Sequence, residues 1–168
     1  MSSQRLYVLD ANVFIEAKKR YYAFDLVPRF WEALVELASS GHVLSIDRVR
    51  HELEKQNDEL TEWARGDFHS WFVSTNESDV LTAYAHLMQW AQAQSQYSDA
   101  AKAEFAKTEN ADAWLVAYAS ARGCVVATHE QPDSTSRRRI KIPDVCIAFQ
   151  VPFIDPFEML RALGVRLS

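Results

Sequence analysis

Short apolar segments separated by helical stretches are the feature that most limits the fold of this chain. The segments Leu6–Leu9, Val43–Ile46 and Cys124–Thr128 have only four or five residues each, which suits strands rather than buried helices. Strands that are buried on both faces form continuous apolar runs and belong to parallel sheets. We therefore predict an α/β fold with three layers, α/β/α, around a central, mostly parallel sheet.

Amphipathic patterns predict the helices that cover this sheet. In the clearest pattern, Phe30, Leu34 and Ala38 share one face, and Gly41 ends the helix. The run from His129 to Lys141 is polar and predicts a loop. A last short strand is expected at Phe153–Ile154. The predicted helices are Val13–Lys19, Asp25–Ser40, Asp47–Gln56, Leu60–Phe72, Leu81–Gln94, Lys102–Phe105, Asn110–Ala121 and Phe157–Leu163.

Length and composition predict one ordinary globular domain over residues 1–168, with a helical insertion at about 60–105. The apolar fraction is 48% and the charged fraction 24%, which is typical of such domains. Cys124 and Cys146 lack the spacing of a zinc site. No apolar run has the length of a signal peptide or a membrane span, so we expect a cytoplasmic protein without membrane contact.

The net charge of −5 argues against a protein that holds nucleic acid mainly through a basic surface. It does not exclude a nuclease, because an acidic pocket that holds divalent cations presents positive charge to phosphate.

Two acids follow predicted strands directly. Asp10 ends the first strand, and Glu130 follows the third strand in the run Thr128-His129-Glu130. A helix cap explains Asp10 equally well, and a solvated loop acid would explain Glu130. Ligands of open parallel sheets bind at the carboxyl ends of the strands, so both residues are candidates for a site.

Two further acids lie on helices that adjoin strands. Glu52 stands next to the apolar face marked by Val49 and Leu53, although a solvated position on the helix explains it as well. Asp112 begins an otherwise apolar helix, where an acid can also stabilise the helix N-terminus.

Taken together, these four acids can converge on one edge of the sheet. Clustered carboxylates repel one another unless they are protonated or bind a cation. Carboxylate oxygens suit Mg²⁺ or Mn²⁺, and such ions activate water and neutralise charge at phosphorus during hydrolysis.

The order and spacing of these motifs resemble the PIN-domain family from Leu6 to about Leu163. Tyr7–Ile15 resembles the opening strand with its aspartate, and Ser45–Lys55 resembles the helix with a glutamate. Asn110–Ala119 resembles the helix that an aspartate begins, and Val125–Glu130 resembles the strand that ends in Thr-x-Asp.

The resemblance implies a metal site made of Asp10, Glu52 and Asp112, with Asn12 and Thr128 as polar groups that shape the pocket. Glu130 stands where the family has a fourth aspartate, so this sequence departs from the pattern there. Asp133 and Asp144 are the alternatives for this fourth acid, although Asp144 also suits a helix cap.

Many bacterial proteins that resemble this chain are VapC-type toxins of toxin–antitoxin pairs. The resemblance thus implies a metal-dependent ribonuclease with an RNA substrate, a homodimer and a small antitoxin partner. The basic run Arg137-Arg138-Arg139 with Lys141 is a candidate for phosphate contacts. A solvated loop, or an anchor for an acidic partner, explains that run equally well.

Other functions fit less well. A haloacid-dehalogenase-like phosphatase would need an acid at position 12, where this chain has Asn12. A nucleotide-binding Rossmann domain would need a glycine-rich turn after the first strand, and the chain has only four glycines. The remaining alternative is a catalytically weak or inactive PIN-like module that binds RNA or protein.

Overall fold

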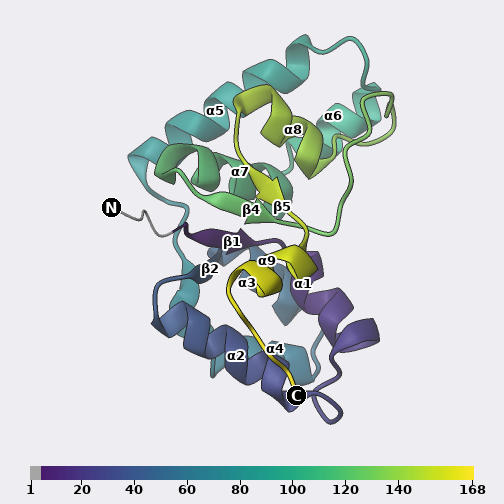
Figure 1. Ribbon diagram of the computed structural model, residues 1–168. Helices are drawn as coiled ribbons and strands as arrows, with labels where there is room; N and C mark the ends of the chain where they lie inside the picture. The colour runs from purple at the N-terminus through teal and green to yellow at the C-terminus, as the bar shows by residue number, and fades with distance from the viewer. Residues whose placement is uncertain (1–4) are drawn as a thin grey trace.

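The sheet is fully parallel. The computed structural model describes residues 5–168. The strands of this part of the chain are β1 (Tyr7–Leu9), β2 (Val43–Ile46), β3 (Phe72–Val73), β4 (Val125–Ala127) and β5 (Phe153–Ile154). They form one sheet in the order β3-β2-β1-β4-β5, and every neighbouring pair is parallel. The carboxyl ends of all the strands therefore lie along one edge, and the first strand, with Asp10 at its end, lies in the middle (Figure 1).

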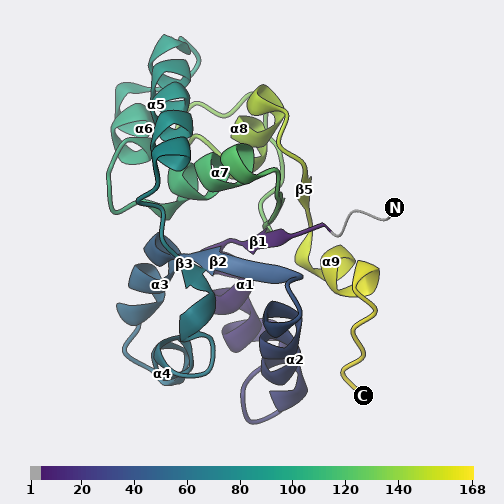
Figure 2. The same ribbon diagram turned by 90° about the vertical axis from the view of Figure 1, so that its left-hand side faces the viewer.

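Helices cover both faces of the sheet. The helices on one face are α5 (Ser78–Ala93), α6 (Asp99–Phe105), α7 (Ala111–Arg122) and α8 (Ile142–Phe149). Those on the other face are α1 (Ala11–Glu16), α2 (Pro28–Ser39), α3 (Asp47–Glu54), α4 (Glu59–Arg65) and α9 (Pro156–Ala162). Figure 2 shows the sheet between these two layers. The predicted three-layer α/β/α class is confirmed.

Several predicted helix bounds need correction. The first helix begins at Ala11, directly after Asp10, and continues into a π-helical turn, Ala17–Tyr21. The second begins at Pro28 rather than Asp25, because proline lacks an N–H and suits the first helical position.

The predicted helix Leu60–Phe72 is wrong in its second half. Helix α4 ends at Arg65 with Gly66 as its C-cap, and a 3₁₀ turn follows at His69–Trp71. Phe72 and Val73 then pair with β2 as the edge strand β3. The segment expected to form a helical insertion thus contributes a strand to the sheet as well as helices, because pairing with β2 outweighs local helix preference.

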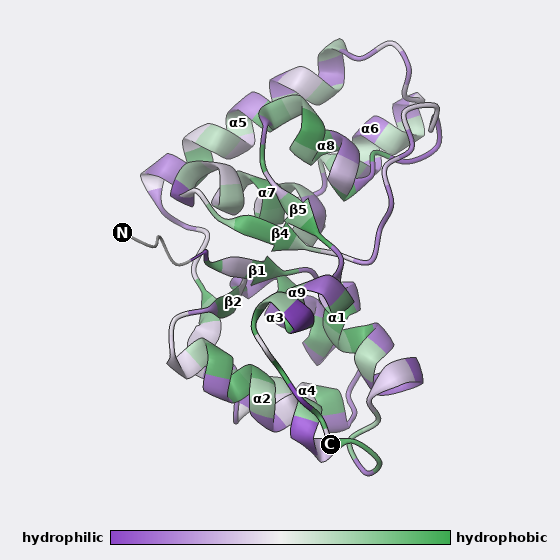
Figure 3. Ribbon diagram, viewed as in Figure 1, coloured by the Kyte–Doolittle hydropathy of each residue, from purple (hydrophilic) through white to green (hydrophobic). Residues whose placement is uncertain are grey.

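The core lies between the sheet and both helical layers. Along α7, Ala113, Leu115, Val116 and Ala117 have no exposed surface, and Figure 3 shows the strands and the helices next to them as largely hydrophobic. On the opposite face, Phe14 of α1 packs in an aromatic cluster with Trp63, Phe68 and Phe72. None of the helices within residues 5–168 is long and apolar enough to span a membrane.

Candidate functional site

A polar cleft opens at the carboxyl edge of the sheet. It has a volume of about 620 Å³ and is lined by the predicted acids Asp10 after β1, Glu52 on α3 and Asp112 on α7. Glu104 on α6 and Glu109 before α7, which the sequence did not suggest, line it as well. Asn12 of α1 also lines it. The structure therefore brings together residues that lie far apart in the sequence, as the motif order predicted.

Asp10 is placed like a helix cap but does not act as one. Its backbone has the extended conformation of an N-cap residue, yet its carboxylate accepts no capping hydrogen bond from α1. Instead, Oδ2 accepts a hydrogen bond of 2.9 Å from the Thr128 hydroxyl. The side chain is buried, with only 3% of the residue exposed. Asp10 is therefore the N-cap residue of α1 by position, as the helix-cap interpretation predicted, but its carboxylate does not cap the helix and faces the cleft.

Asp112 is likewise not needed to cap its helix. The N-cap of α7 is Asn110, whose side-chain oxygen accepts a hydrogen bond of 3.0 Å from the Asp112 backbone N–H. Asn110 in turn donates from Nδ2 to the carbonyl oxygen of Glu104 at 3.0 Å. This bond ties the start of α7 to the end of α6, and the Asp112 carboxylate is left to face the cleft.

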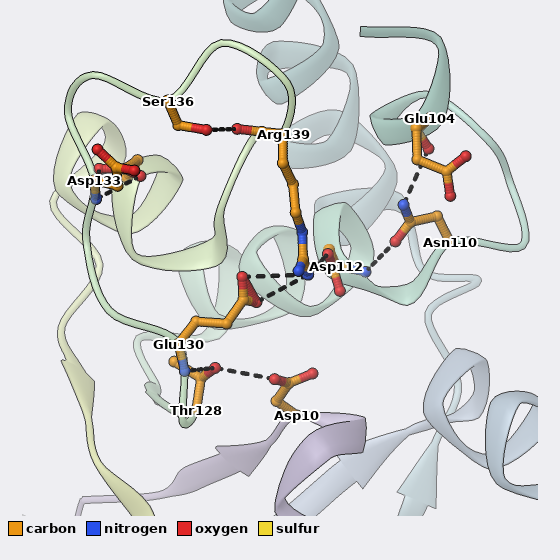
Figure 4. A network of polar contacts seen from close by, with 10 residues as sticks. Asp10, Glu104, Asn110, Asp112, Thr128, Glu130, Asp133, Ser136 and Arg139 are labelled. Atoms are coloured by element: carbon orange, nitrogen blue, oxygen red, sulfur yellow. Dashed lines mark hydrogen bonds and ion pairs between the residues drawn. The ribbon is translucent and has the colours of Figure 1, made fainter. Parts of the chain in front are cut away.

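Glu130 is not a solvated loop acid. Its side chain is only 10% exposed, and its backbone N–H donates to the Thr128 hydroxyl at 3.1 Å. Its carboxylate lies against Arg139, whose Nη2 is 3.3 Å from Glu130 and 3.4 Å from Asp112 Oδ2 (Figure 4). The Thr128 hydroxyl therefore donates a hydrogen bond to Asp10 and accepts one from Glu130, and so holds both residues in place.

The two alternatives for the fourth acid lie elsewhere. Both carboxylate oxygens of Asp144, in the first turn of α8, accept hydrogen bonds of 3.1 Å from the Asp133 backbone N–H. Asp133 accepts hydrogen bonds from Thr135 through Oδ1. These contacts close the loop before α8, and neither residue lines the cleft. Glu130 does not line the cleft either, but its carboxylate contacts Arg139, which does, and its charge raises the pKa of Asp10. Glu130 is therefore the fourth acid whose position fits best.

Crowding of the acids dominates the electrostatics of the cleft. Burial raises the pKa of Asp10 well above its ordinary value, and the charges of Asp112 and Glu130 raise it further. Burial likewise raises the pKa values of Glu52, Asp112 and Glu130. Arg139 opposes the shift at Asp112 and Glu130. When these carboxylates are all ionised they repel one another, which costs free energy unless a cation offsets their charge.

The donor set fits a hard divalent cation. All four acids offer oxygen, which Mg²⁺ and Mn²⁺ prefer. The buried Oε1 of Glu130 accepts no hydrogen bond, although Arg139 Nη2 lies 3.3 Å from it as an ion-pair partner. Within residues 5–168, however, no three His, Cys, Asp or Glu side chains form a group that could hold an ion as they stand. The acids are gathered around one cleft, but a cation would need their side chains to reorient.

Basic side chains form the rim of the same cleft. Arg138 and Arg139 line it, whereas Arg137 and Lys141, which the sequence also suggested, do not. Lys55 and Lys107 line it as well. Sequence reasoning missed both lysines, although Lys55 stands three positions after Glu52, where α3 presents the same face.

Replacing Thr128 tests how firmly Asp10 and Glu130 must be held. Thr128→Val keeps the shape of the side chain but removes the hydroxyl that serves both residues. Loss of such an outer partner of a metal ligand typically lowers metal affinity or activity by about 10–100-fold, and we expect that loss here. Thr128→Ser keeps the hydroxyl and should retain most of the Mn²⁺ affinity in titration calorimetry. Equal affinities in the two variants would show that the hydroxyl does not matter.

Comparisons with known proteins show the family and the fold of this chain. A family model described as "Domain of unknown function (DUF4411)" matches residues 7–167. No curated protein matches the chain. A search of solved structures finds similarity to the "Crystal structure of VapBC2 from Rickettsia felis bound to a DNA fragment from their promoter". A chain of that structure aligns with a TM-score of 0.51 and 14% identity, over 89% of this chain and 98% of its own length. At this identity the likeness shows the fold alone, which is PIN-like.

Proposed function

We propose that this chain, which belongs to the family described as "Domain of unknown function (DUF4411)", is a Mg²⁺- or Mn²⁺-dependent endoribonuclease. The observation that carries the proposal is the buried carboxylate of Asp10. It makes no capping hydrogen bond to α1 and, within residues 5–168, no ion pair with a basic side chain, and it shares a cleft with Glu52 and Asp112. Burying a charged group in this way is costly, and binding a cation is the common reason for it.

In this proposal Asp10, Glu52 and Asp112 hold the cation, and Glu130 is the fourth acid. The bound ion would activate a water molecule and neutralise charge at the scissile phosphate. Thr128 fixes the direction of the Asp10 carboxylate through the hydrogen bond from its hydroxyl. Asn12 offers a neutral polar group at the wall of the cleft, where it could orient water or substrate.

The rim of the cleft supports a nucleic acid as the substrate, and the PIN-like fold favours RNA. The basic residues around the acids are Lys55 at the C-cap of α3, Lys107 after α6 and Arg138 in the loop before α8. They can bind phosphates on either side of the cut bond, and such contacts position a nucleic acid without reading its sequence. The net charge of −5 restricts favourable phosphate contact to this local rim and to the ion itself.

We further propose that the chain acts as the toxin of a toxin–antitoxin pair, as a homodimer with a small protein inhibitor. The support is the PIN-like fold shared with a chain of the VapBC2 structure, together with the order of the acidic motifs.

The test of this proposal is RNA cleavage by purified protein with Mn²⁺ or Mg²⁺. We expect the wild type to cut RNA with either ion and to stop in EDTA, and we expect Asp112→Asn to be inactive while keeping its circular dichroism spectrum. Expression of the wild type should arrest growth, and Asp112→Asn should relieve the arrest. Cation-independent RNA binding without cleavage would overturn the proposal and favour the inactive PIN-like module.

A further inference from the structure

Arg139 stands between two of the acids that would hold the cation. Its Nη2 is 3.4 Å from Asp112 Oδ2 and 3.3 Å from Oε1 of Glu130. Figure 4 shows the guanidinium reaching down from the loop before α8 into the space between the two carboxylates. A positive group therefore already lies where two proposed ligands would have to meet around an ion.

These contacts have the character of a weak, replaceable pair. Charge-assisted hydrogen bonds of this type are usually 2.7–2.9 Å long, and both contacts of Arg139 are longer. The Arg139 side chain is 53% exposed, whereas Asp112 and Glu130 are 19% and 10% exposed. The acids are thus fixed and covered, while water reaches their arginine partner and weakens the attraction.

The backbone of Arg139 is anchored, so the side chain can leave without moving the loop. The carbonyl oxygen of Arg139 accepts a hydrogen bond of 2.7 Å from the Ser136 hydroxyl. The next residue, Ile140, is buried, and the carbonyl oxygen of Arg137 accepts a bond of 2.9 Å from the Ser98 N–H. Rotation about the side-chain bonds of Arg139 is therefore enough to free Asp112 and Glu130.

We infer that Arg139 is an internal counter-cation of the acidic cleft, and that a divalent cation binds by displacing its guanidinium from Asp112 and Glu130. The inference rests on the metal site of the proposed function. It explains why the cleft gathers the acids and yet no three of them, within the part of the chain that the structure describes, form a group that could hold an ion. A divalent ion carries twice the charge of the guanidinium and can contact Asp10 as well, so it is the stronger partner for the cluster.

Arg138 provides a matched control. It adjoins Arg139 in the chain, lines the same cleft and carries the same charge, but no ion pair joins it to the acids among the residues described. Replacing either arginine by glutamine lowers the local positive charge equally. A difference between the two variants therefore reports the contacts of Arg139 with Asp112 and Glu130.

The experiment measures Mn²⁺ affinity by titration calorimetry, without RNA, and the thermal midpoint in EDTA. We expect Arg139→Gln to bind Mn²⁺ about two- to fivefold more tightly than the wild type and to unfold at a lower temperature in EDTA. Saturating Mn²⁺ should remove that difference in stability. Arg138→Gln lowers the same local charge without breaking an ion pair to the acids, so it should change both measurements less than Arg139→Gln does.

Each result of this experiment either supports or overturns the inference about Arg139. Unchanged or weaker Mn²⁺ binding by Arg139→Gln overturns the inference. If Asp112→Asn, in a protein that keeps Arg139, abolishes Mn²⁺ binding, the proposed metal site stands even though the inference about Arg139 fails. Mn²⁺ binding by Arg139→Gln but not by the wild type supports the inference in its strongest form. Absence of binding by both proteins overturns the inference together with the metal site. An arginine that only contacts RNA phosphate would leave Mn²⁺ affinity unchanged.

Discussion

Asp10→Asn is expected to abolish cleavage and, in the absence of metal, to make the protein more stable than the wild type. Loss of a charged group at the reacting centre costs a rate factor on the order of 100- to 1000-fold. The amide of asparagine is neutral, so it escapes the repulsion that Asp112 and Glu130 exert on the buried carboxylate. It can still accept the hydrogen bond that Thr128 donates. RNase assays and thermal melts in EDTA measure the two effects separately.

The stability gain should depend on pH with a defined sign. An acid whose pKa is raised in the folded state binds more protons there than in the unfolded chain, so stability falls as pH rises between the two pKa values. The pKa of Asp10 is raised well above 3.8. The wild type in EDTA should therefore lose stability relative to Asp10→Asn as the pH rises above the ordinary pKa of an aspartate, about 4, and the loss should end once Asp10 is ionised in the folded state as well.

Mn²⁺ should reverse the order of stability, so that the wild type becomes more stable than Asp10→Asn. Ligand at about 100 times its dissociation constant stabilises the folded state by about 2.7 kcal/mol, and only the wild type keeps the full ligand set. Asp25→Asn is the control, because Asp25 is exposed and lies outside the cleft; it should match the wild type in every measurement. An Asp10→Asn protein that melts below the wild type in EDTA would contradict our account of Asp10.

The fold was largely predictable because its strands are short, apolar and separated by clear helices. Val43–Ile46 and Phe153–Ile154 form strands at the predicted positions. The predicted helix Asn110–Ala121 forms as α7, and Gly123 is its C-cap in the left-handed conformation that glycine adopts without strain. These features depend on residues close together in the chain, which a sequence pattern can report.

The parts that failed depend on distant partners. Phe72 and Val73 become a strand only because β2 offers an unpaired edge, and no local pattern of two residues can reveal that. The predicted start of α2 at Asp25 is too early. The prediction gave more weight to the helical preference of the residues before Pro28 than to the proline, which favours the first position of a helix.

The candidate site also has a part that the sequence predicted and a part that it did not. The sequence pointed to Asp10, Glu52, Asp112 and Glu130, because acids at strand ends and beside apolar faces stand out from their surroundings. It did not reveal the pairing of Arg139 with two of them, which depends on how a long loop folds back over α7. The rim lysines were missed for a related reason, since an isolated lysine is usually a solvated surface residue.

Phe14→Ala is expected to cause the largest loss of stability of any change considered. Phe14 has no exposed surface, and its ring lies 5.7–5.9 Å from those of Trp63, Phe68 and Phe72. Truncating a buried phenylalanine costs about 3–5 kcal/mol, and each kcal/mol lowers the melting temperature of a chain of this size by about 2–4 °C. Leu26→Ala is the control, because Leu26 is 78% exposed, and it should change stability by less than about 0.5 kcal/mol.

The position of Phe14 also links this packing to the cleft. It lies on α1, the helix that begins directly after Asp10 and carries Asn12, and it packs against Phe72 of the edge strand β3. The same aromatic cluster therefore fixes both the end of the sheet and the helix that leads away from the central acid. Phe14→Ala should lower the melting temperature in EDTA and also reduce the shift that Mn²⁺ produces, because α1 is less firmly held. A variant that loses stability in EDTA but keeps the full Mn²⁺ shift would show that the acids are positioned by the sheet alone.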